Sequence, residues 1–275
     1  MTDTATLTPT EIRHTIGASG SLALRNVSGR IRLTATDGDE AVVRVRSESG
    51  KEIRLNVERS EGSLLVEPER QGSGFFKLNI SFGDGLEFDV DVPRGARLDV
   101  KAVSADIDVT GLGGEQSYKT VSGDIRLARV GGRLSAMTVS GDLRLHDGGE
   151  LELDAATTSG DVTIEAELLR RLGVRTVSGD VRAVGRLEAG PRHAVETVSG
   201  DLRLETPSGV SIDASRALDF GKRDRGPLVF GDGAARLLFR SMSGDQHVKV
   251  TGLGSARAAE GAPLAAPVEQ PDRIE

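Results

Sequence analysis

Hydroxyl and carboxylate side chains recur at regular intervals along this chain, in a short phrase that ends in Ser-Gly-Asp. The phrase reads Thr-Val-Ser-Gly-Asp four times and appears twice in altered form, as Thr-Thr-Ser-Gly-Asp and Ser-Met-Ser-Gly-Asp. A degenerate copy, Ala-Val-Ser-Ala-Asp, precedes them at Ala102–Asp106. A row of carboxylates could bind Ca²⁺, and a row of outward hydroxyls could form a flat array of the kind that ice-binding solenoids present. The six complete triplets are Ser122-Gly123-Asp124, Ser140-Gly141-Asp142, Ser159-Gly160-Asp161, Ser178-Gly179-Asp180, Ser199-Gly200-Asp201 and Ser243-Gly244-Asp245.

The residues around each Asp favour a structural role over a metal site. The calcium-binding repeat of known solenoids is a nonapeptide Gly-Gly-x-Gly-x-Asp pattern, which this phrase lacks. In most copies an Arg stands two residues after the Asp, and residues two apart on a strand share a face. Asp after Gly also suits a tight turn. We therefore predict that the triplets form structural corners in which Asp pairs with Arg, and that the chain has no catalytic residue, no cofactor and no metal.

The histidines and one basic segment are the remaining candidates for chemistry. The four histidines occupy different places relative to the repeat, so we expect solvated surface residues rather than metal ligands; they are His14, His146, His193 and His247. No nucleophile elbow, phosphate loop or His-Glu-x-x-His motif is present. The repeat fails between Ala214 and Gly233, and loops on rigid scaffolds often carry function. We predict a partner contact by the basic residues of this stretch, which are Lys222, Arg223 and Arg225.

The spacing of the phrase indicates the fold that must position these residues. Successive copies, counted at the residue before Asp, stand at 105, 123, 141, 160, 179 and 200, so the steps are 18, 18, 19, 19 and 21 residues. After each Asp, apolar and polar residues alternate, as in Ile125-Arg126-Leu127, which predicts a strand with one face inward. A second Gly corner and a second strand follow. Such coils leave backbone groups unpaired unless neighbouring coils stack on them. We predict an all-β, single-stranded β-solenoid, parallel β-helix-like and right-handed, with coils of about 18–21 residues.

The corner itself has two possible orientations. If the second strand runs unbroken into the phrase, as in Leu134, Ala136, Thr138 and Ser140, then Thr and Ser point inward and Val points outward. A kink before Val would instead bury Val and expose Thr and Ser. Buried hydroxyls need partners along the stack, since an unpaired one costs about 1–3 kcal/mol. We favour inward Ser, with Gly supplying the unusual backbone angles of the corner.

Four regions follow from the period and the composition. We expect a flexible N-terminus over residues 1–20 and an irregular β region over 21–100 that is continuous with the solenoid. The regular repeats occupy 101–251. The stretch 252–275 is rich in Ala, Pro and Glu without a period, so we expect it to be disordered.

Composition narrows the class of partner. The net charge of −7 argues against nucleic acid, because phosphate binding needs a basic surface. The chain contains no cysteine, which excludes disulfides and thiolate metal sites. It shows neither a signal-peptide pattern nor a stretch long enough to span a membrane. We therefore expect a cytoplasmic protein with a protein partner or self-association.

The chain resembles a bacterial family of unknown function with β-strand repeats, whose members are often labelled "putative adhesin". The resemblance is carried by Phe88–Val100 (Phe-Asp-Val-Asp-Val-Pro-Arg-Gly-Ala-Arg-Leu-Asp-Val), then Val103–Asp106, then the Thr-Val-Ser-Gly-Asp series, and covers roughly Ser21 to Val250. It implies an all-β repeat fold and no known catalytic residues. We expect a non-enzymatic binding or scaffold module. The alternatives are a polymerising scaffold like the bactofilins, and a surface adhesin if a signal peptide has been removed.

Overall fold

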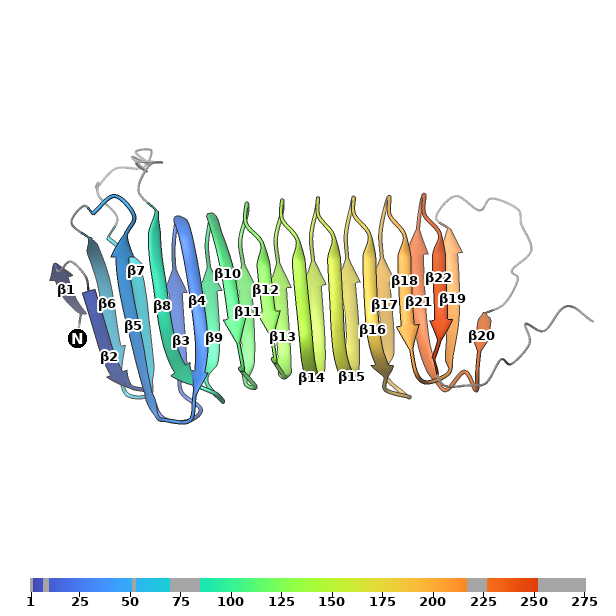
Figure 1. Ribbon diagram of the computed structural model, residues 1–275, viewed down its shortest axis with the longest axis horizontal. Helices are drawn as coiled ribbons and strands as arrows, with labels where there is room; N and C mark the ends of the chain where they lie inside the picture. Colours follow the sequence, from blue (N-terminus) through green and yellow to red (C-terminus); the bar gives the residue numbers. More distant parts are fainter. Residues whose placement is uncertain (1, 7–9, 51–52, 70–84, 217–226, 252–275) are drawn as a thin grey trace, which may run out of the picture.

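The computed structural model describes the chain except for residues 1, 7–9, 51–52, 70–84, 217–226 and 252–275. The strands lie across the long axis of an elongated molecule and form two facing rows (Figure 1). Within the described residues there are 22 strands, all hydrogen-bonded into one sheet, and no helix.

The first row contains the second half of each central coil. In the order of their pairing it comprises β1 (Thr2–Thr6), β6 (Arg54–Ser60), β7 (Ser63–Pro68), β3 (Ser21–Arg25), β9 (Arg97–Lys101), β11 (Glu115–Lys119), β13 (Gly132–Met137), the second halves of β14 (Leu143–Ala156) and β15 (Val162–Arg175), β17 (Arg192–Glu196), β21 (Ala235–Ser241), β19 (Val210–Arg216) and β20 (Leu228–Phe230).

The second row contains the strands that follow the Ser-Gly-Asp corners. It comprises β2 (Thr10–Thr15), β5 (Glu40–Ser47), β8 (Leu86–Pro93), β4 (Ser28–Thr36), β10 (Ser104–Thr110), β12 (Ile125–Ala128), the first halves of β14 and β15, β16 (Val181–Leu187), β18 (Leu202–Thr206) and β22 (Gln246–Val250).

Side chains that point inward from both rows form one continuous apolar core. Ile107 pairs with Ile125, which pairs with Leu143, and all three are fully buried. Burying one such side chain contributes about 1.5–3 kcal/mol. The same register continues through Val162 and Val181, so the predicted steps between copies reappear as the steps between paired strands. Alternation after each Asp is therefore what places one face of each strand in the core.

The predicted single-stranded, parallel β-solenoid is wrong as a description of the fold. The strands form one nearly closed mixed sheet, in which the long strands β14 and β15 pass from one row into the other. Pairing is parallel through the middle, but antiparallel for β1–β6, β6–β7, β2–β5 and β5–β8 at the N-terminal end and for β19–β20 at the other.

The physical reason for the difference is a change of turn type near the N-terminus. Ser60 pairs with Ser63, so Glu61 and Gly62 form a two-residue hairpin turn that reverses the chain within the same row, and Gly62 has φ +72°. Strand β8 lies between β4 and β5, parallel to the first and antiparallel to the second. A rule taken from the Ser-Gly-Asp corners cannot anticipate these reversals.

The N-terminal residues also differ from the expectation. Residues 1–20 were expected to be flexible, yet Thr2–Thr6 pairs with Arg54–Glu58 and Thr10–Thr15 pairs with Glu40–Val45. Two edge strands are thus added where a loose end was predicted. The predicted disordered tail, 252–275, lies outside the described residues.

Candidate functional site

The Ser-Gly-Asp triplets stack directly on one another along one edge of the molecule. Bridges join each Ser to the Ser of the next copy, from Ser122 to Ser243. At each Gly the preceding copy comes so close that a Cβ would collide with its backbone: at Gly141 it would lie 2.1 Å from the carbonyl oxygen of Gly123. The corner therefore needs Gly because the coils approach one another too closely for a side chain.

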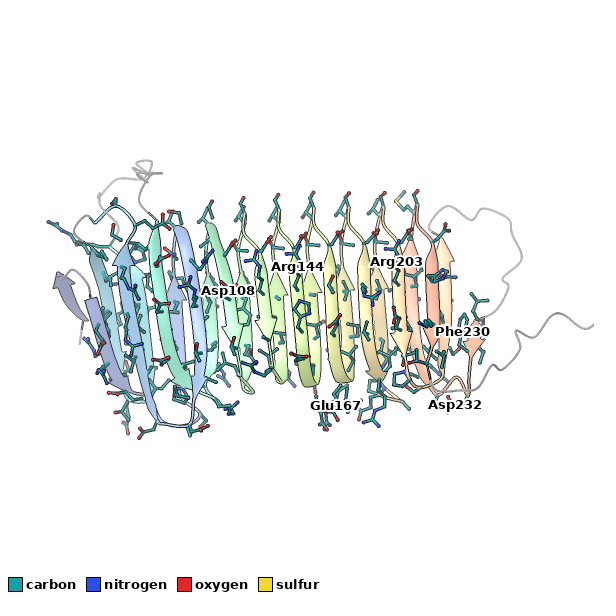
Figure 2. The ribbon with its side chains drawn as sticks, viewed as in Figure 1. Asp108, Arg144, Glu167, Arg203, Phe230 and Asp232 are labelled. Atoms are coloured by element: carbon teal, nitrogen blue, oxygen red, sulfur yellow. The ribbon has the colours of Figure 1, made fainter. Side chains whose placement is uncertain are left out.

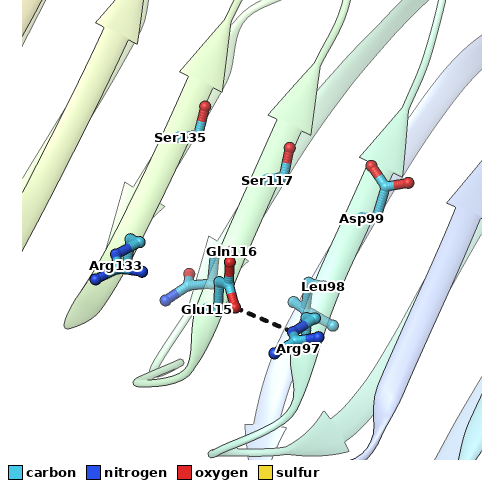
Figure 3. A pocket seen from close by; sticks show the side chains of 8 residues that line it. All are labelled: Arg97, Leu98, Asp99, Glu115, Gln116, Ser117, Arg133 and Ser135. Carbon is cyan, nitrogen blue, oxygen red and sulfur yellow. Dashed lines mark ion pairs between the residues drawn. The ribbon is translucent and has the colours of Figure 1, made fainter.

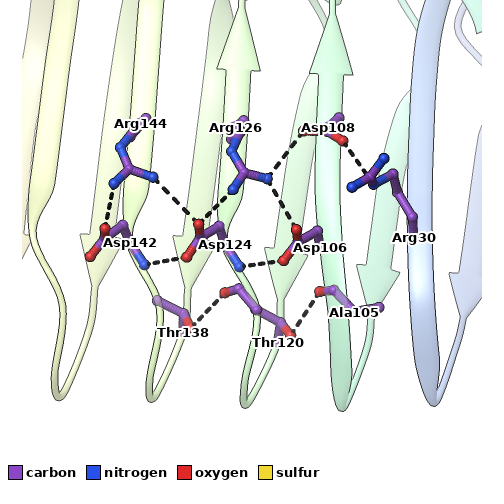
Figure 4. Close-up of polar contacts among 11 residues, drawn as sticks. Arg30, Ala105, Asp106, Asp108, Thr120, Asp124, Arg126, Thr138, Asp142 and Arg144 are labelled. Carbon is purple, nitrogen blue, oxygen red and sulfur yellow. Dashed lines mark hydrogen bonds and ion pairs between the residues drawn. The ribbon is translucent and has the colours of Figure 1, made fainter.

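Each Asp binds the backbone of the next copy. The Oδ1 atom of Asp106 accepts the N–H of Asp124 at 3.0 Å, and the Oδ1 atom of Asp124 accepts the N–H of Asp142 at 3.0 Å (Figure 4). The same bond recurs at 2.9 Å at every further step, ending with the N–H of Asp245 on Asp201. The carboxylates thus satisfy donors at the point where the ladder of strands is interrupted.

The second oxygen of these carboxylates is taken by arginine. Arg126 lies 2.6 Å from Asp124 and 3.1 Å from Asp106, and Arg144 repeats the arrangement with Asp142 at 2.5 Å and Asp124 at 3.4 Å (Figure 4). The labelled Arg144 and Arg203 in Figure 2 mark this arginine column on the outer face of the second row.

Three of the six complete copies depart from the column. Thr163 and His247 stand where Arg would follow Asp161 and Asp245, and Arg182 pairs with Glu205 at 2.9 Å rather than with an Asp of the phrase. Burial alone would raise the pKa of Asp106, but the N–H of Asp124 and the Arg126 guanidinium outweigh it and hold that pKa below its ordinary value. No group of three or more metal-ligating side chains occurs among the described residues.

The corner combines one part of each of the two predicted orientations. Thr is inward: Thr120 and Thr138 are 4% and 2% exposed and donate to the carbonyls of Ala105 and Gly123, both at 3.3 Å. Ser is outward, so the preference for inward Ser is wrong. The strand parity ends at Thr, and the chain turns at Val-Ser, which exposes both residues. The hydroxyls without a partner among the described buried side chains belong to Thr176, Thr197 and Ser241.

The turn creates an exposed, uncharged edge that we call the corner ridge. Large hydrophobic side chains that are exposed in the described part of the chain number nine, and six of them lie here, each 39–47% exposed. Figure 2 shows side chains projecting from the corners along this edge. The corner ridge consists of Val103, Val121, Val139, Val177, Val198 and Met242, Thr158 at the equivalent place, and the exposed serines Ser104, Ser122, Ser140, Ser159, Ser178, Ser199 and Ser243.

His193 contradicts the expectation that the histidines are solvated. It is fully buried; its Nδ1 accepts the N–H of Leu172 at 3.2 Å, and its Nε2 donates to the carbonyl of Glu188 at 2.9 Å. Burial lowers the pKa of His193, although the Glu188 carbonyl opposes the shift. The signal was in the sequence, because His193 has the same strand parity as Val195, which is also fully buried.

A shallow pocket of about 330 Å³ lies on the outer face of the first row. Arg97 and Glu115 in its lining already form an ion pair with each other at 3.0 Å. Asp99, Ser117 and Ser135 also line the pocket, one on each of three successive strands (Figure 3). We assign it no chemistry. The basic segment predicted to contact a partner, Lys222, Arg223 and Arg225, lies outside the described residues, and that contact stays a prediction.

Sequence reasoning predicted the Asp124–Arg126 and Asp142–Arg144 pairs but was wrong about Arg182, and it missed the corner ridge. The missing information was where parity breaks inside Thr-Val-Ser. Thr158, which stands where the other copies have Val or Met, was the available hint that the position faces solvent.

The chain matches solved structures from Bacteroides and Parabacteroides species at low sequence identity. A Bacteroides fragilis protein described as a "putative adhesin" is 10% identical, with 88% of this chain and 99% of that chain covered and a TM-score of 0.49. A Parabacteroides distasonis "putative lipid binding protein" is 12% identical, with 87% and 97% covered and a TM-score of 0.42. A second Parabacteroides distasonis protein, a "putative adhesin", is 10% identical, with 86% and 95% covered and a TM-score of 0.38. At these identities the function has to be argued from the residues of the chain itself.

Sequence comparison gives a firmer result. None of the curated proteins is similar enough to count as a relative. Among the described residues, no helix has the length and hydrophobicity that a membrane crossing requires. The Toastrack DUF4097 family matches residues 20–217, which is most of the chain, and the chain therefore belongs to that family.

Proposed function

We propose that this protein is a non-enzymatic binding module whose corner ridge contacts a protein partner. One observation carries the proposal: six of the nine large hydrophobic side chains that are exposed in the described chain gather on this one edge. Single exposed apolar residues are ordinary on protein surfaces, but an aligned group of them marks an interaction site.

The fold does not require an apolar residue at this position. Thr158 stands at the place of Val139 and Val177 in neighbouring copies, and it is exposed with the same backbone pairing through Ser159. A β-branched polar residue therefore satisfies the corner. Val in the other copies supplies apolar surface that folding does not use, which supports a role in binding.

The ridge is also rigid and evenly spaced. Each copy is fixed to the next by the Ser bridge and by the bond from the Asp carboxylate to the following N–H. Neighbouring strands lie about 4.8 Å apart, so the ridge repeats at that interval. A surface that is ordered before binding loses little conformational entropy when a partner docks.

The state of the carboxylates supports a non-enzymatic role. Glycoside cleavage, the chemistry found on some elongated β folds, needs two carboxylates that are free to act as acid and as base or nucleophile. Here Asp124 and Asp142 each accept a backbone N–H and an arginine, so their oxygens are engaged in holding the corner.

Affinity purification from the native host tests the ridge. The test variant is V121T/V139T/V177T/V198T, which copies the natural Thr158. The control variant M137T/L228T/V229T removes exposed apolar residues that lie off the ridge. We expect one identified partner to be recovered with the wild type and the control, and to fall at least about tenfold with the ridge variant. Equal recovery with all three proteins would contradict the proposal.

Two other roles remain as proposals with their own tests. One observation favours a polymerising scaffold: within the described chain β22 pairs with β18 alone, so its other edge could pair with a second copy. One observation disfavours it: that second copy would present the antiparallel strands β1 and β2, which do not continue the parallel pairing. Filaments of purified protein in electron micrographs would establish it, and monodisperse particles would remove it. A surface adhesin predicts native protein at the cell surface, whereas the expected cytoplasmic location predicts it in the cytosolic fraction.

A further inference from the structure

Charged residues on neighbouring strands form a column on the outer face of the first row. Their charges alternate in sign along the first part of the column, but the last residues of the column are all arginine. Arg97 contacts Glu115 at 3.0 Å, and Arg133 contacts Glu152 at 3.2 Å. The register places Glu115 beside Arg133, and Glu152 beside Arg171.

Beyond Arg171 the alternation fails. Gly173 pairs with Ala194, which puts Arg192 in the place beside Arg171, and Arg192 pairs directly with Arg236. Three arginines therefore stand in a row where the earlier pattern would supply an acid.

Among the described residues, the last two of these arginines have no counter-ion. Arg171 leans toward Asp154 at 3.6 Å, but no carboxylate in the described part of the chain forms an ion pair with Arg192 or Arg236. Adjacent like charges on neighbouring strands repel one another. Acidic residues outnumber basic ones in this chain, with 42 Asp and Glu against 35 Lys and Arg, so a row of three arginines is a local property.

The arginine row lies beside a line of small or apolar residues on the same outer face. These are the next outward residues along the same strands, Gly173, Ala194 and Leu238, and the line ends at Asp213, which pairs with Leu238. Two more arginines lie on the other side of this line and share Glu196 at 3.5 Å each; they are Arg175 and Arg240. We call this surface the arginine patch.

One carboxylate of the protein already shows how an acid fits there. The Oδ1 atom of Asp154 lies 2.5 Å from where a Cβ on Gly173 would stand, and it faces Arg171. One strand further on, Ala194 and Arg192 repeat the small residue and the arginine, but no carboxylate of the described chain forms an ion pair with Arg192. Asp213 stands beside Leu238 at the outer edge of the patch, and no ion pair joins it to Arg236.

We propose that the arginine patch binds an acidic segment of a partner protein. Carboxylates of that segment pair with Arg192 and Arg236, for which guanidinium is well suited because it can donate two parallel hydrogen bonds. Apolar side chains of the segment rest on Ala194 and Leu238. These two residues and Gly173 offer no side-chain hydrogen-bonding group for sugar hydroxyls, and the net charge of −7 disfavours nucleic acid. The patch lies on the outer face of the first row, so it is a surface distinct from the corner ridge.

A matched pair of variants tests the proposal. R192S/R236S removes the two arginines that have no counter-ion in the described part of the chain, and R97S/R133S removes two arginines of the same column with the same change in net charge. The probe is a fluorescein-labelled peptide in which Glu alternates with Leu, measured by fluorescence anisotropy. Circular dichroism establishes that both variants fold.

We expect the wild type and R97S/R133S to bind the peptide alike, with affinity that falls as salt rises, and R192S/R236S to bind about tenfold more weakly or worse. Absence of binding to the wild type, or equal weakening by both variants, would overturn the proposal. If a polyuronate or single-stranded DNA binds more tightly than the peptide and loses that binding in R192S/R236S, the assignment to a protein segment is wrong. The ridge variant V121T/V139T/V177T/V198T should bind the peptide normally, which separates this test from that of the ridge.

Discussion

Replacing Gly160 by Ala should destabilise the protein strongly, because two features of the corner act against any side chain there. Gly160 has φ +154°, a conformation that residues with a Cβ rarely adopt. A Cβ at this place would also lie 2.1 Å from the carbonyl oxygen of Gly141, whereas ordinary contact begins at 3.4 Å. The neighbouring copy would have to move away by more than 1 Å.

The expected cost follows from those two features. Backbone strain of this kind costs about 1–3 kcal/mol. Separating these two copies weakens the bonds between them, of which the Ser159 N–H to the Val139 carbonyl at 2.8 Å and the Gly141 N–H to the Ser159 carbonyl at 3.2 Å are the nearest. Each contributes about 1 kcal/mol. The free energy of unfolding should therefore fall by about 3–5 kcal/mol.

Gly38→Ala is the matched control, since its Cβ would meet nothing nearer than 4.0 Å and its φ is not in the left-handed region. We expect this change to be neutral or to stabilise the protein, by at most about 1 kcal/mol. Urea unfolding followed by circular dichroism compares the midpoints, and hydrogen exchange reports whether the loss is local, because long repetitive arrays do not always unfold in two states. If Gly160→Ala and Gly38→Ala unfold at the same midpoint, the close-approach argument is refuted.

Ala105 shows that the close-approach argument for Gly does not extend to the degenerate first copy. Ala105 occupies the equivalent place in the degenerate first copy and is fully buried. Its corner is different, because β10 begins at Ser104 and Ala105 pairs as regular strand with Gly29. A Cβ is tolerated there since the chain is already extended.

Three further predictions concern ionisable residues. The pKa of His193 is lowered from 6.5 in the folded protein, so the unfolded state binds the proton more readily, and the stability that His193 contributes is complete above about pH 6.5 and falls below it. On acidification the urea midpoint of the wild type should therefore approach that of His193→Leu. Midpoints that stay equally far apart at every pH would exclude the effect. Tyr118 is the single tyrosine and burial raises its pKa well above 10.0, so phenolate absorbance should appear only together with alkaline unfolding, and ionisation of the native protein near pH 10.0 would contradict its burial. Asp142→Ala should cost about 1–2 kcal/mol while the exposed Asp213→Ala changes stability by less than about 0.5 kcal/mol, and thermal unfolding of the two would show no difference if the Asp ladder were dispensable.

The local rules of the repeat could be predicted from the sequence. Alternation after each Asp identified the buried residues of the second row, as at Ile125 and Leu127, and two-residue spacing identified the Asp124–Arg126 pair. These predictions held because they depend on the periodicity of a strand, which adjacent residues fix by themselves.

Features that depend on pairing between distant strands could not be predicted in this way. The phrase aligns the second row, but the first row follows register shifts within β14 and β15, between Leu151 and Glu152 and between Glu165 and Leu168. The row formed by Arg171, Arg192 and Arg236 is visible only after those shifts. The antiparallel end was missed for a related reason: hairpin turns replace the repeating corner there.

Each Asp carboxylate bonds to the N–H of the next copy in the same way, so the length of this molecule can change by whole copies without a change in the corner. Asp142 and Asp161 make equivalent bonds to the copies beside them, so excising residues 142–160 would join Gly141 to Asp161 and restore an intact Ser-Gly-Asp corner. Recombination between copies can then shorten or lengthen the rod by whole units while both termini keep their own structure. Duplication of one repeat unit would therefore change the distance between the two ends of the molecule while the fold stays the same.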